Sequence, residues 1–339
     1  MLIRAKAPLR LSFAGGGTDI RTFFEQEGGC VLNATINRFA WGSLRPRQDK
    51  QIQIESVDFG FSLNLDTESE IVYDGKLDLV KAVIRNLGGQ DSTGFDLFLH
   101  SDAPPGSGLG SSSTLMVSLV GLLKEFKSLP LTDYEISNLA YSIEREQLGI
   151  KGGMQDQYAA TFGGFNFIEF FQDRVIVNPL RVRQDVINEL EHNLLLCYTG
   201  TTRASDHIID DQIRRYHRLE DDTLSGLRHQ KQLAVEMKNT LLRGRLNEFG
   251  ALLHAAWEYK KKMSPRISNA RIDEMYDAAQ REGALGGKIT GAGGGGYMVF
   301  YCQFDRKHRV AELLSKMGGL PTGYAFEPYG LQTWKVDES

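Results

Sequence analysis

Cysteine is scarce in this sequence, and its spacing fits neither a disulfide framework nor a metal cluster. Cys30, Cys197 and Cys302 are odd in number, widely separated and flanked by apolar residues, which favours buried reduced thiols. The sequence contains no C-x-x-C pair, H-E-x-x-H helix or EF-hand loop. A metal site built only from protein ligands therefore has little support.

Long hydrophobic runs are also missing. The longest apolar window, Leu115–Leu123, is interrupted by Ser118 and Gly121 and is far shorter than the roughly 20 residues that span a bilayer. The N-terminus, MLIRAKAPLR, is charged early and lacks the apolar stretch of a signal peptide. We therefore expect a cytoplasmic protein that has no membrane partner.

No sign of charge dominates. Lys and Arg together number 39 against 43 Asp and Glu, which gives a formal net charge of −4. Because nucleic-acid-binding proteins are usually more basic, we expect small-molecule partners rather than nucleic acid. Nothing in the sequence indicates an oligomeric state.

By contrast, the chain is long and rich in glycine. The 339 residues compare with a prior of roughly 100 to 200 per domain, which suggests two domains that share a cleft. A hydrophobic fraction of 41% excludes wholesale disorder. Many of the 36 glycines are clustered, and the clusters direct attention to possible binding loops.

Apolar periodicity predicts alternating strands and helices. Thr132 and Glu135 form a capping-box pattern at the start of one helix. The character changes after Pro179, where one buried strand is followed by about eighty mostly helical, charged residues. The predicted strands are 3–13, 30–36 and 39–45 (these two as a hairpin), 51–55, 95–100, 165–169, 175–177, 193–198 and 297–302, and the other predicted helices are 77–87, 112–127, 132–148, 273–282 and 306–317.

The strongest local signal is PPGSGLGSSS at Pro104–Ser113, between a predicted strand and a predicted helix. Glycines let the backbone approach an anion, and the unpaired amides at a helix N-terminus point at it. The hydroxyls of Ser111, Ser112 and Ser113 can cap those amides, bind a phosphate oxygen or offer an oxygen to Mg²⁺. We interpret the segment as a phosphate loop rather than a serine-capped turn.

Two common nucleotide motifs are excluded. The P-loop pattern is absent, because Gly287-Lys288 has Glu282 where the first glycine should be and Ile289 where Ser or Thr should be. Gly291–Gly296 matches G-x-G-x-x-G, but a predicted strand follows it instead of a helix. A Rossmann dinucleotide site is therefore rejected.

Three glycine clusters occur in a characteristic order: PLRLSFAGGGTD at Pro8–Asp19, PPGSGLGSSS, and KITGAGGGG at Lys288–Gly296. Together they resemble the three motifs of the GHMP kinases, and the resemblance covers nearly the whole chain. It implies a two-domain α+β fold, with a ribosomal-protein-S5-like N-terminal domain at residues 1–180 and a ferredoxin-like C-terminal domain with added helices at 181–339.

The resemblance implies ATP and Mg²⁺ as cofactors. The family's phosphate loop corresponds here to Pro105, Gly106, Ser107, Gly108, Leu109, Gly110, Ser111, Ser112 and Ser113. Ser112 and Glu144 would bind Mg²⁺, with Glu146 as a substitute for Glu144.

The same resemblance implies a catalytic aspartate and a basic partner. Asp156, in GGMQDQYAATFGG at Gly152–Gly164, would accept the proton of the attacking hydroxyl, while Arg10 would stabilise transition-state charge. Without the resemblance, Asp156 could equally cap a short helix and Arg10 could be a surface arginine.

The acceptor corner is also carried over by resemblance. Gly15–Asp19 aligns with the Gly-Glu-His-Thr-Asp of galactokinase, so Gly16 and Gly17 replace Glu and His, which argues against galactose. The residues implied for substrate binding are Gly17, Thr18, Asp19, Gly153, Gly293 and Gly294.

Within the family, GGGTDI at Gly15–Ile20 and VLNATIN at Val31–Asn37 are most similar to kinases that phosphorylate the anomeric hydroxyl of D-glycero-D-manno-heptose 7-phosphate. A phosphorylated substrate needs a second anion site. The first candidates are Thr201, Thr202 and Arg203, in TGTTRASD at Thr199–Asp206. Lys260-Lys261-Lys262 with Arg266 is the second, although a solvated helix end is favoured there.

Two alternatives stay open from the sequence. One is a kinase for another sugar, such as fucose or an N-acetylhexosamine. The other is a catalytically silent sensor of sugar and ATP, against which the retention of Asp156, Arg10 and the complete phosphate loop argues.

Overall fold

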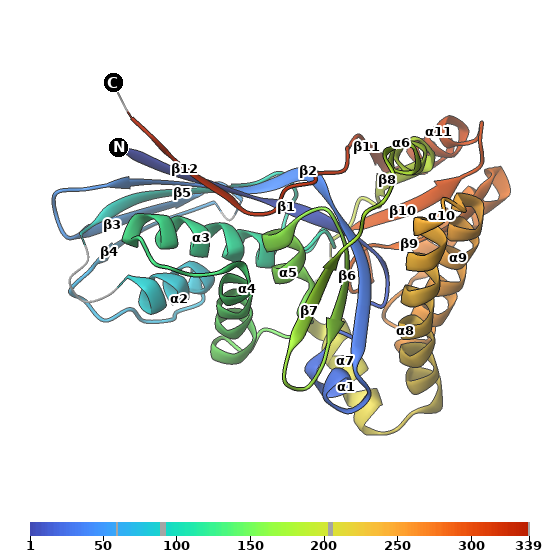
Figure 1. Ribbon diagram of the computed structural model, residues 1–339, viewed down its shortest axis with the longest axis horizontal. Coiled ribbons are helices and arrows are strands. Elements are labelled where there is room, and N and C mark those ends of the chain that lie inside the picture. Colours follow the sequence, from blue (N-terminus) through green and yellow to red (C-terminus); the bar gives the residue numbers. More distant parts are fainter. Residues whose placement is uncertain (59, 89–92, 203–205, 338–339) are drawn as a thin grey trace.

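The computed structural model describes residues 1–58, 60–88, 93–202 and 206–337 (Figure 1). Within these ranges the strands form an eight-stranded sheet and a four-stranded sheet. The helices lie beside the two sheets, and the chain has the mixed helix and strand content of an α+β fold (Figure 1).

The larger sheet is antiparallel except where β3 pairs with β5 in parallel. Its main path has the order β12-β1-β2-β5-β3-β4, and β6 pairs with both β2 and β7. The strands are β1 (Leu2–Ala14), β2 (Gly29–Pro46), β3 (Gln51–Ser56), β4 (Phe61–Asp66), β5 (Phe95–Ser101), β6 (Phe165–Phe170), β7 (Val175–Pro179) and β12 (Gln332–Val336).

β2 corrects one prediction. The two strands that we expected to form a hairpin are a single strand of 18 residues. Asn37 and Arg38, which separate the predicted strands, lie at a register shift, since Pro8 pairs with Phe39 and the next residue of β1 pairs with Ile36. A bulge of this kind bends a strand without ending it, so β2 continues along β1 instead of turning back.

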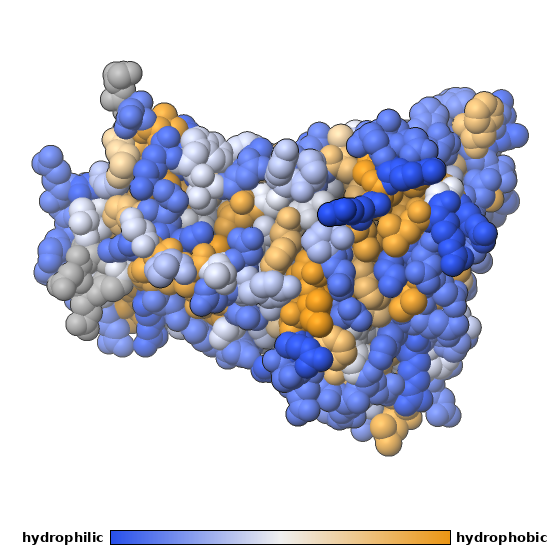
Figure 2. Space-filling model, in the orientation of Figure 1, coloured by the Kyte–Doolittle hydropathy of each residue, from blue (hydrophilic) through white to orange (hydrophobic). Residues whose placement is uncertain are grey.

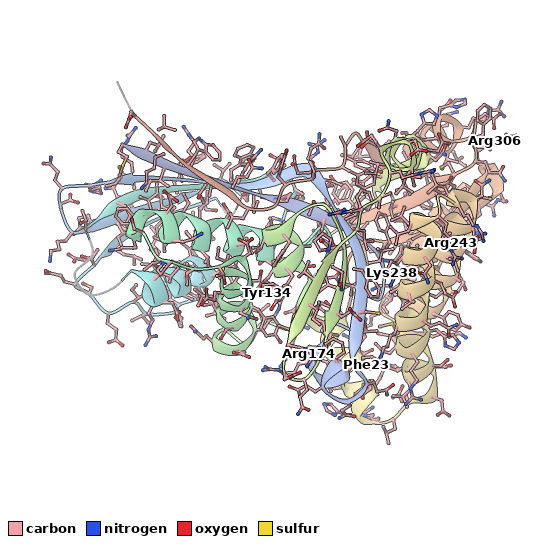
Figure 3. All side chains as sticks on the ribbon, in the orientation of Figure 1. Phe23, Tyr134, Arg174, Lys238, Arg243 and Arg306 are labelled. Atoms are coloured by element: carbon pink, nitrogen blue, oxygen red, sulfur yellow. The ribbon has the colours of Figure 1, made fainter. Side chains whose placement is uncertain are left out.

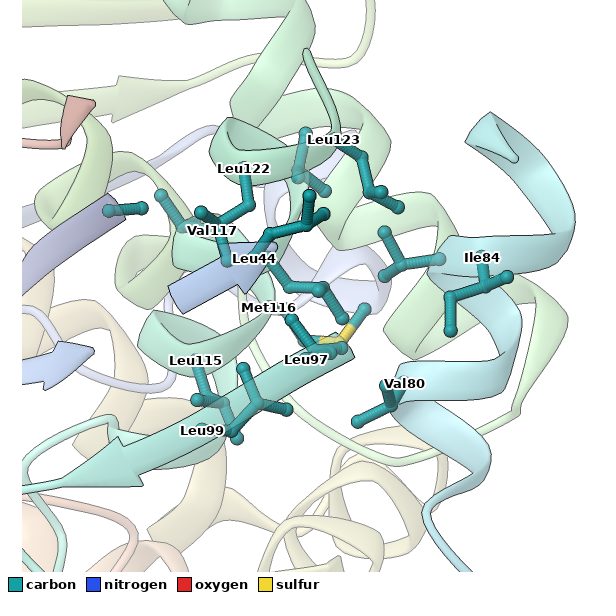
Figure 4. Close-up of a cluster of buried hydrophobic side chains, with 14 of the residues drawn as sticks. Leu44, Val80, Ile84, Leu97, Leu99, Leu115, Met116, Val117, Leu122 and Leu123 are labelled. Carbon is teal, nitrogen blue, oxygen red and sulfur yellow. The ribbon is translucent and has the colours of Figure 1, made fainter. Parts of the chain in front are cut away.

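Helices pack on one face of this sheet: α2 (Asp78–Leu87), α3 (Ser111–Lys127), α4 (Asp133–Tyr141) and α5 (Gln155–Phe162), with α1 (Arg21–Glu27) at the β1–β2 connection. α3 is the central one, and Leu115, Met116 and Leu122 pack with Leu44 and Leu97 of the sheet (Figure 4). This burial fixes α3 and therefore fixes the loop before it.

The predicted helix 132–148 begins as expected. Thr132 and Glu135 form the capping box, which is confirmed. After Tyr141 the helix widens into a π-helical turn at Ser142–Gln147 (η1), and such turns are frequent at functional sites. The turn carries Glu144, which is buried, and Glu146, which is partly exposed.

The smaller sheet has the order β11-β8-β10-β9 and is antiparallel. Its strands are β8 (Leu194–Tyr198), β9 (Ala284–Ile289), β10 (Tyr297–Cys302) and β11 (Leu320–Thr322), and the neighbouring helices are α6 (Gln184–Asn193), α7 (Asp206–His217), α8 (Asp221–Leu242), α9 (Leu246–Met263), α10 (Ala270–Glu282) and α11 (Lys307–Lys316). β4, β9, α5 and α6 were not predicted. The two strands have only six residues each and α5 has eight, too few for a clear period.

The two sheets share a core. Phe13 of β1 packs edge to face with Phe249 of α9, with ring centroids 5.3 Å apart. Lys238 of α8 lies over the ring of Phe167 on β6 at 4.2 Å, and Figure 3 shows Lys238 beside that part of the sheet. β12 pairs with β1, so the end of the chain returns to the larger sheet. The division at residue 180 remains our proposal.

The described surface and thiols fit the composition. Cys30, Cys197 and Cys302 are buried and unpaired with one another, which confirms that prediction. Hydrophilic residues cover much of the face drawn in Figure 2. Among the described helices, none combines the length and apolar character needed to cross a bilayer.

Candidate functional site

The loop that we predicted to bind phosphate lies between β5 and α3, which confirms its predicted position between a strand and a helix. Gly106, Gly108 and Gly110 have φ values of +76°, +83° and +78°, a backbone region that favours glycine. The three glycines line an open cleft together with Ser111, Ser112 and Ser113 at the start of α3. The unpaired amides of the first turn of α3 therefore lie where they can meet an anion.

Three residues of the predicted loop do not line the cleft, and two of them anchor the loop to neighbouring segments. Ser107 and Leu109 are buried, and neither they nor Pro105 line the cleft. The backbone carbonyl of Ser107 accepts a 2.8 Å hydrogen bond from the amide of Tyr297. Leu109 accepts a 3.1 Å bond from the amide of Arg10, so these residues attach the loop to its neighbours.

The third glycine motif packs directly on the phosphate loop. The Thr290 hydroxyl donates to the carbonyl of Gly108 at 2.9 Å. A Cβ on Gly296 would lie 2.2 Å from the carbonyl oxygen of Ser107, so only glycine allows this approach. The motif therefore fixes the loop by backbone contact.

Arg10 and Asp156 form an ion pair at the base of the loop. The Arg10 Nη2 atom lies 2.7 Å from Asp156 Oδ1, and its Nε donates to the same oxygen at 2.8 Å. Arg10 is 4% exposed and also donates to the carbonyl of Gly108 at 2.6 Å. One guanidinium thus holds both the aspartate and the loop.

Glu144 and Ser112 meet on the other side of the loop. Glu144 is 1% exposed and accepts from the Ser112 hydroxyl at 3.3 Å, from Ser113 at 2.7 Å and from the Gln157 amide at 2.7 Å. Carboxylate and hydroxyl oxygens are the donors that Mg²⁺ prefers. Within the described ranges there is no cluster of three His, Cys, Asp or Glu, so phosphate and water oxygens would have to complete the shell.

Glu146 lies elsewhere. It is 42% exposed, pairs with Arg21 at 2.7 Å and does not line the cleft. Between the two glutamates, the geometry favours Glu144 as the residue that faces Ser112.

Asp19 lines the cleft, and both of its carboxylate oxygens are held by the backbone. Its Oδ1 accepts from the amide of Gly17 at 2.9 Å, and its Oδ2 accepts from the amide of Gln155 at 3.2 Å. A Cβ on Gly153 would lie 1.9 Å from Asp19 Oδ2, so the backbone at Gly153 runs against the carboxylate. Burial raises the pKa of Asp19, and the negative charge of Asp156 adds to this.

Of the other residues predicted to bind substrate, some line the cleft and others do not. Gly17, Gly153 and Gly293 line the cleft. Thr18 is buried beneath it, where its hydroxyl bonds to the backbone of Gly15 and Cys30. Gly294 donates its amide to the carbonyl of Ile267 and does not line the cleft.

The first predicted second-anion site is only partly described. Thr202 is exposed and is not among the residues that line the cleft. Arg203 lies outside the described residues.

The position of Lys260 differs from our prediction. We expected the lysine run to be a solvated helix end, and this holds for Lys262, which is exposed, and in part for Lys261, which pairs with Glu258. Lys260 is 4% exposed and lines the cleft. The signal was in the helical period, because Phe249, Leu253, Trp257 and Lys260 follow one buried stripe of α9.

Three further cleft residues had no sequence signal: Ser12, Gln155 and Gln212. All three are buried or nearly so. Single serines and glutamines on a strand or helix carry no spacing that distinguishes a binding side chain from a structural one.

Lys260 lines the cleft, and Lys288 lies next to it, beside Ser12. Burial lowers the pKa of Lys260 to about 8, opposed by the charge of Asp19 and assisted by that of Arg10. Burial also lowers the pKa of Lys288, whose ammonium nitrogen lies 2.6 Å from the carbonyl of Ser12. The cleft therefore joins a helix N-terminus and basic side chains, Arg10 and Lys260 among them, to the carboxylates of Asp19, Glu144 and Asp156. This arrangement is suited to a polyanion and a hydroxyl acceptor.

Two family models match the chain. The model described as GHMP kinases N terminal domain matches residues 77–164, and the one described as GHMP kinases C terminal matches residues 237–319. The first covers α2, the phosphate loop, Glu144 and Asp156, and the second covers Lys260 and the third glycine motif.

Named relatives cover nearly the whole chain. The D-glycero-alpha-D-manno-heptose 7-phosphate kinase of Campylobacter jejuni is 40% identical over 98% of this chain and 99% of its own length. The bifunctional fucokinase/GDP-fucose pyrophosphorylase of Arabidopsis thaliana is 28% identical over 90% of this chain but only 30% of its own length.

Solved structures extend the likeness to three dimensions. A D-glycero-D-manno-heptose 1-phosphate kinase from Bacteroides thetaiotaomicron has a TM-score of 0.81 at 37% identity, covering 99% of this chain and 100% of its own. Lactococcus lactis galactokinase in complex with galactose has a TM-score of 0.76 at 22% identity, covering 99% and 95%, and that likeness concerns the fold alone.

Proposed function

Since this chain belongs to the GHMP kinase family, whose two-domain α+β fold and ATP-dependent phosphotransferase activity it shares, we propose that its acceptor is D-glycero-D-manno-heptose 7-phosphate. The γ-phosphate of ATP is transferred to the anomeric hydroxyl, giving the 1,7-bisphosphate and ADP. The observation that carries the proposal is the Arg10–Asp156 ion pair beside the phosphate loop, in a chain 40% identical to a heptose 7-phosphate kinase.

The phosphate loop binds the triphosphate in this mechanism. The glycines at 106, 108 and 110 bring the backbone close to the phosphates, and the amides at the start of α3 donate to their oxygens. The third glycine motif keeps the loop in place through Tyr297 and Thr290. This preorganisation supplies the positioning on which phosphoryl transfer mainly depends.

Asp156 accepts the proton of the attacking hydroxyl. As the new bond forms between the anomeric oxygen and the γ-phosphorus, the bond from that phosphorus to the β,γ-bridging oxygen breaks and ADP leaves. Arg10 orients the Asp156 carboxylate and offers positive charge beside the transferring group. The aspartate is 18% exposed, so a substrate hydroxyl can reach it.

Mg²⁺ would be held by Glu144 and Ser112, whose oxygens lie 3.3 Å apart. When bound it would neutralise charge on the phosphates. Glu144 is already oriented by Ser113 and Gln157, so it is preorganised for this role.

Asp19 orients the sugar from the opposite side. Its two oxygens are fixed by the amides of Gly17 and Gln155, which leaves it positioned to accept hydrogen bonds from sugar hydroxyls. The absence of a side chain at Gly16 leaves space beside the backbone, since a Cβ there would meet its nearest neighbours only at 3.6 Å.

A substrate panel tests the proposal. With ATP and Mg²⁺, kcat/KM is measured for heptose 7-phosphate, unphosphorylated heptose, mannose, fucose and galactose. We expect heptose 7-phosphate to be the best acceptor by at least tenfold. A higher kcat/KM for fucose would favour the other-sugar alternative, and ATP binding without turnover of any acceptor would favour the sensor.

A further inference from the structure

Lys260 is a buried cation without a protein partner in the described structure. Its side chain comes from α9 into the cleft and is 4% exposed. Across residues 1–58, 60–88, 93–202 and 206–337, no hydrogen bond or ion pair joins its ammonium to another residue. A buried, unpaired charge is costly, so its presence in a cleft points to a ligand that pairs with it.

Unsatisfied polar atoms surround the same point. Ser12 Oγ and Gln155 Oε1 are both buried without a hydrogen-bond partner, and both residues line the cleft. Gln212, which is 4% exposed, reaches the cleft from α7. These side chains come from β1, α5, α7 and α9, so four separate elements converge on one place.

Gly16 marks the centre of this convergence. A Cβ built on Gly16 would lie 3.6 Å from Ser12 Oγ, 3.6 Å from Gln155 Nε2 and 3.7 Å from Lys260 Nζ. These are ordinary van der Waals distances, so space is available beside the backbone. A longer side chain at this position would fill that space.

The residue at position 16 therefore controls the charge of the subsite. A glutamate there, as in galactokinase, would begin beside the Lys260 ammonium and could neutralise it. Glycine leaves the ammonium available for an anion that arrives with the substrate. The negative charge of Asp19 acts on the Lys260 ammonium, but the two oxygens of that carboxylate already accept hydrogen bonds from backbone amides.

We propose that Lys260, Ser12, Gln155 and Gln212 form the subsite that binds the phosphate group already present on the acceptor sugar. The ammonium of Lys260 pairs with the phosphate, while the Ser12 hydroxyl and the side-chain Nε2 groups of Gln155 and Gln212 donate hydrogen bonds to its oxygens. The unpartnered Gln155 Oε1 is an acceptor, and it takes a hydrogen bond from a sugar hydroxyl. Gln155 and Asp156 are consecutive on α5, so the subsite and the base belong to one rigid element. The proposal rests on the proposed function, because it assigns the non-reacting end of that acceptor.

Lys260→Met tests the proposal, with Lys261→Met as the matched control one residue along the same helix. Lys261 is 32% exposed and pairs with Glu258 at the surface, so its loss leaves the cleft unchanged. KM and kcat are measured with heptose 7-phosphate, with unphosphorylated heptose and with ATP. Lys260→Arg, which keeps the charge, should retain part of the affinity.

Loss of the cation should raise the KM for heptose 7-phosphate roughly 10²-fold, because a charge-assisted contact to phosphate is removed. The kcat/KM for unphosphorylated heptose and the KM for ATP should change less than threefold. An equal loss with both acceptors, or a rise confined to the KM for ATP, would overturn the proposal, since Lys260 would then act on hydroxyls or on the nucleotide.

A binding measurement separates this proposal from the proposed function. Calorimetry on the nucleotide-free protein compares heptose 7-phosphate and mannose 6-phosphate with their unphosphorylated sugars. We expect the phosphorylated sugars to bind more tightly, and Lys260→Met to abolish the difference. If the wild-type protein shows no preference for a phosphorylated sugar, the subsite is wrong, even where turnover supports the kinase. If the preference exists but no heptose is turned over, the substrate assignment fails and the subsite stands.

Discussion

Arg10 and Asp156 lie 146 positions apart in the sequence and are joined by two contacts to one carboxylate oxygen, at 2.7 and 2.8 Å. Arg10 also donates to the carbonyl of Gly108, so β1, α5 and the phosphate loop meet at one guanidinium. A carboxylate fixed in this way is held in one orientation, which is what a base needs in order to meet an acceptor hydroxyl. This relationship underlies our assignment of Asp156 as the base.

Asp156→Asn should lower kcat by on the order of 10² to 10⁴. The amide cannot accept the hydroxyl proton, but it has nearly the same shape, so the phosphate loop should stay intact. Steady-state kinetics and nucleotide binding by calorimetry check this. The control is Asp173→Asn, at a carboxylate that is 71% exposed and pairs with its neighbour Arg174. A variant at 156 that kept near-full turnover would remove that carboxylate from the mechanism.

Glu144→Gln should raise the Mg²⁺ concentration needed for half-maximal activity by at least tenfold, since a buried carboxylate beside Ser112 is replaced by a neutral amide. Glu146→Gln is the matched control two residues along the same π-helical turn, and we expect a change of less than twofold. Activity titrations with Mg²⁺ give both values. The reverse order of effects would assign the metal to Glu146.

Gly153→Ala and Gly16→Ala should differ sharply. The new methyl at 153 would lie 1.9 Å from Asp19 Oδ2 and must displace the carboxylate, whereas the methyl at 16 meets its nearest neighbours at 3.6 Å. We expect Gly153→Ala to lower kcat/KM for the acceptor at least 10²-fold and Gly16→Ala to lower it less than tenfold. Similar losses in both variants would contradict this prediction, because they would show that the Cβ distances at Gly153 and Gly16 do not determine the effect on kcat/KM.

Lys260→Met should stabilise the protein. The pKa of Lys260 is about 8 in the folded protein against an ordinary value of 10.5, so the unfolded chain binds the proton more tightly. The resulting penalty is full below pH 8 and fades as the pH rises toward 10.5. Asp19 from the β1–α1 connection, Arg10 from β1 and Lys288 from β9 are the charged groups that interact with it electrostatically.

We therefore expect the variant to raise the free energy of unfolding by on the order of 1 to 3 kcal/mol at pH 7, and to lose this gain above about pH 10. Urea denaturation at both pH values measures it. A destabilised variant at pH 7 would mean that the ammonium has a stabilising partner in the protein, contrary to the proposed role of Lys260. A buried charge that serves binding usually lowers stability, so its removal should give a protein that is more stable and binds more weakly.

The sequence predicted the features that depend on local pattern. The strand, glycine loop and helix around Gly106–Ser113, the capping box at Thr132 and the strand after Gly296 are all found in the structure. Each of these features depends on residues close together in the sequence: glycines that allow a positive φ, a residue pair that caps a helix, or the alternation of a strand. The family resemblance supplied the topology, which periodicity alone could not.

The features that the sequence did not predict depend on contacts between segments that are distant in the chain. The polar pair Asn37-Arg38 separated two predicted strands, but a bulge against Pro8 carries β2 through it. Lys260 was interpreted with its charged neighbours, although the period of α9 places it with Trp257 on the buried stripe. The convergence of Ser12, Gln155 and Gln212 is set by the packing of three elements, and no sequence spacing records it.

The measurement that tests the central claim most directly is ³¹P NMR of the product formed from heptose 7-phosphate and ATP with Mg²⁺. We predict one new phosphate resonance coupled to the anomeric proton, a retained 7-phosphate resonance and one ADP for each product molecule. A new phosphate on any other carbon, or ADP formation without a phosphorylated sugar, would contradict the assignment of the anomeric hydroxyl as the group that faces Asp156.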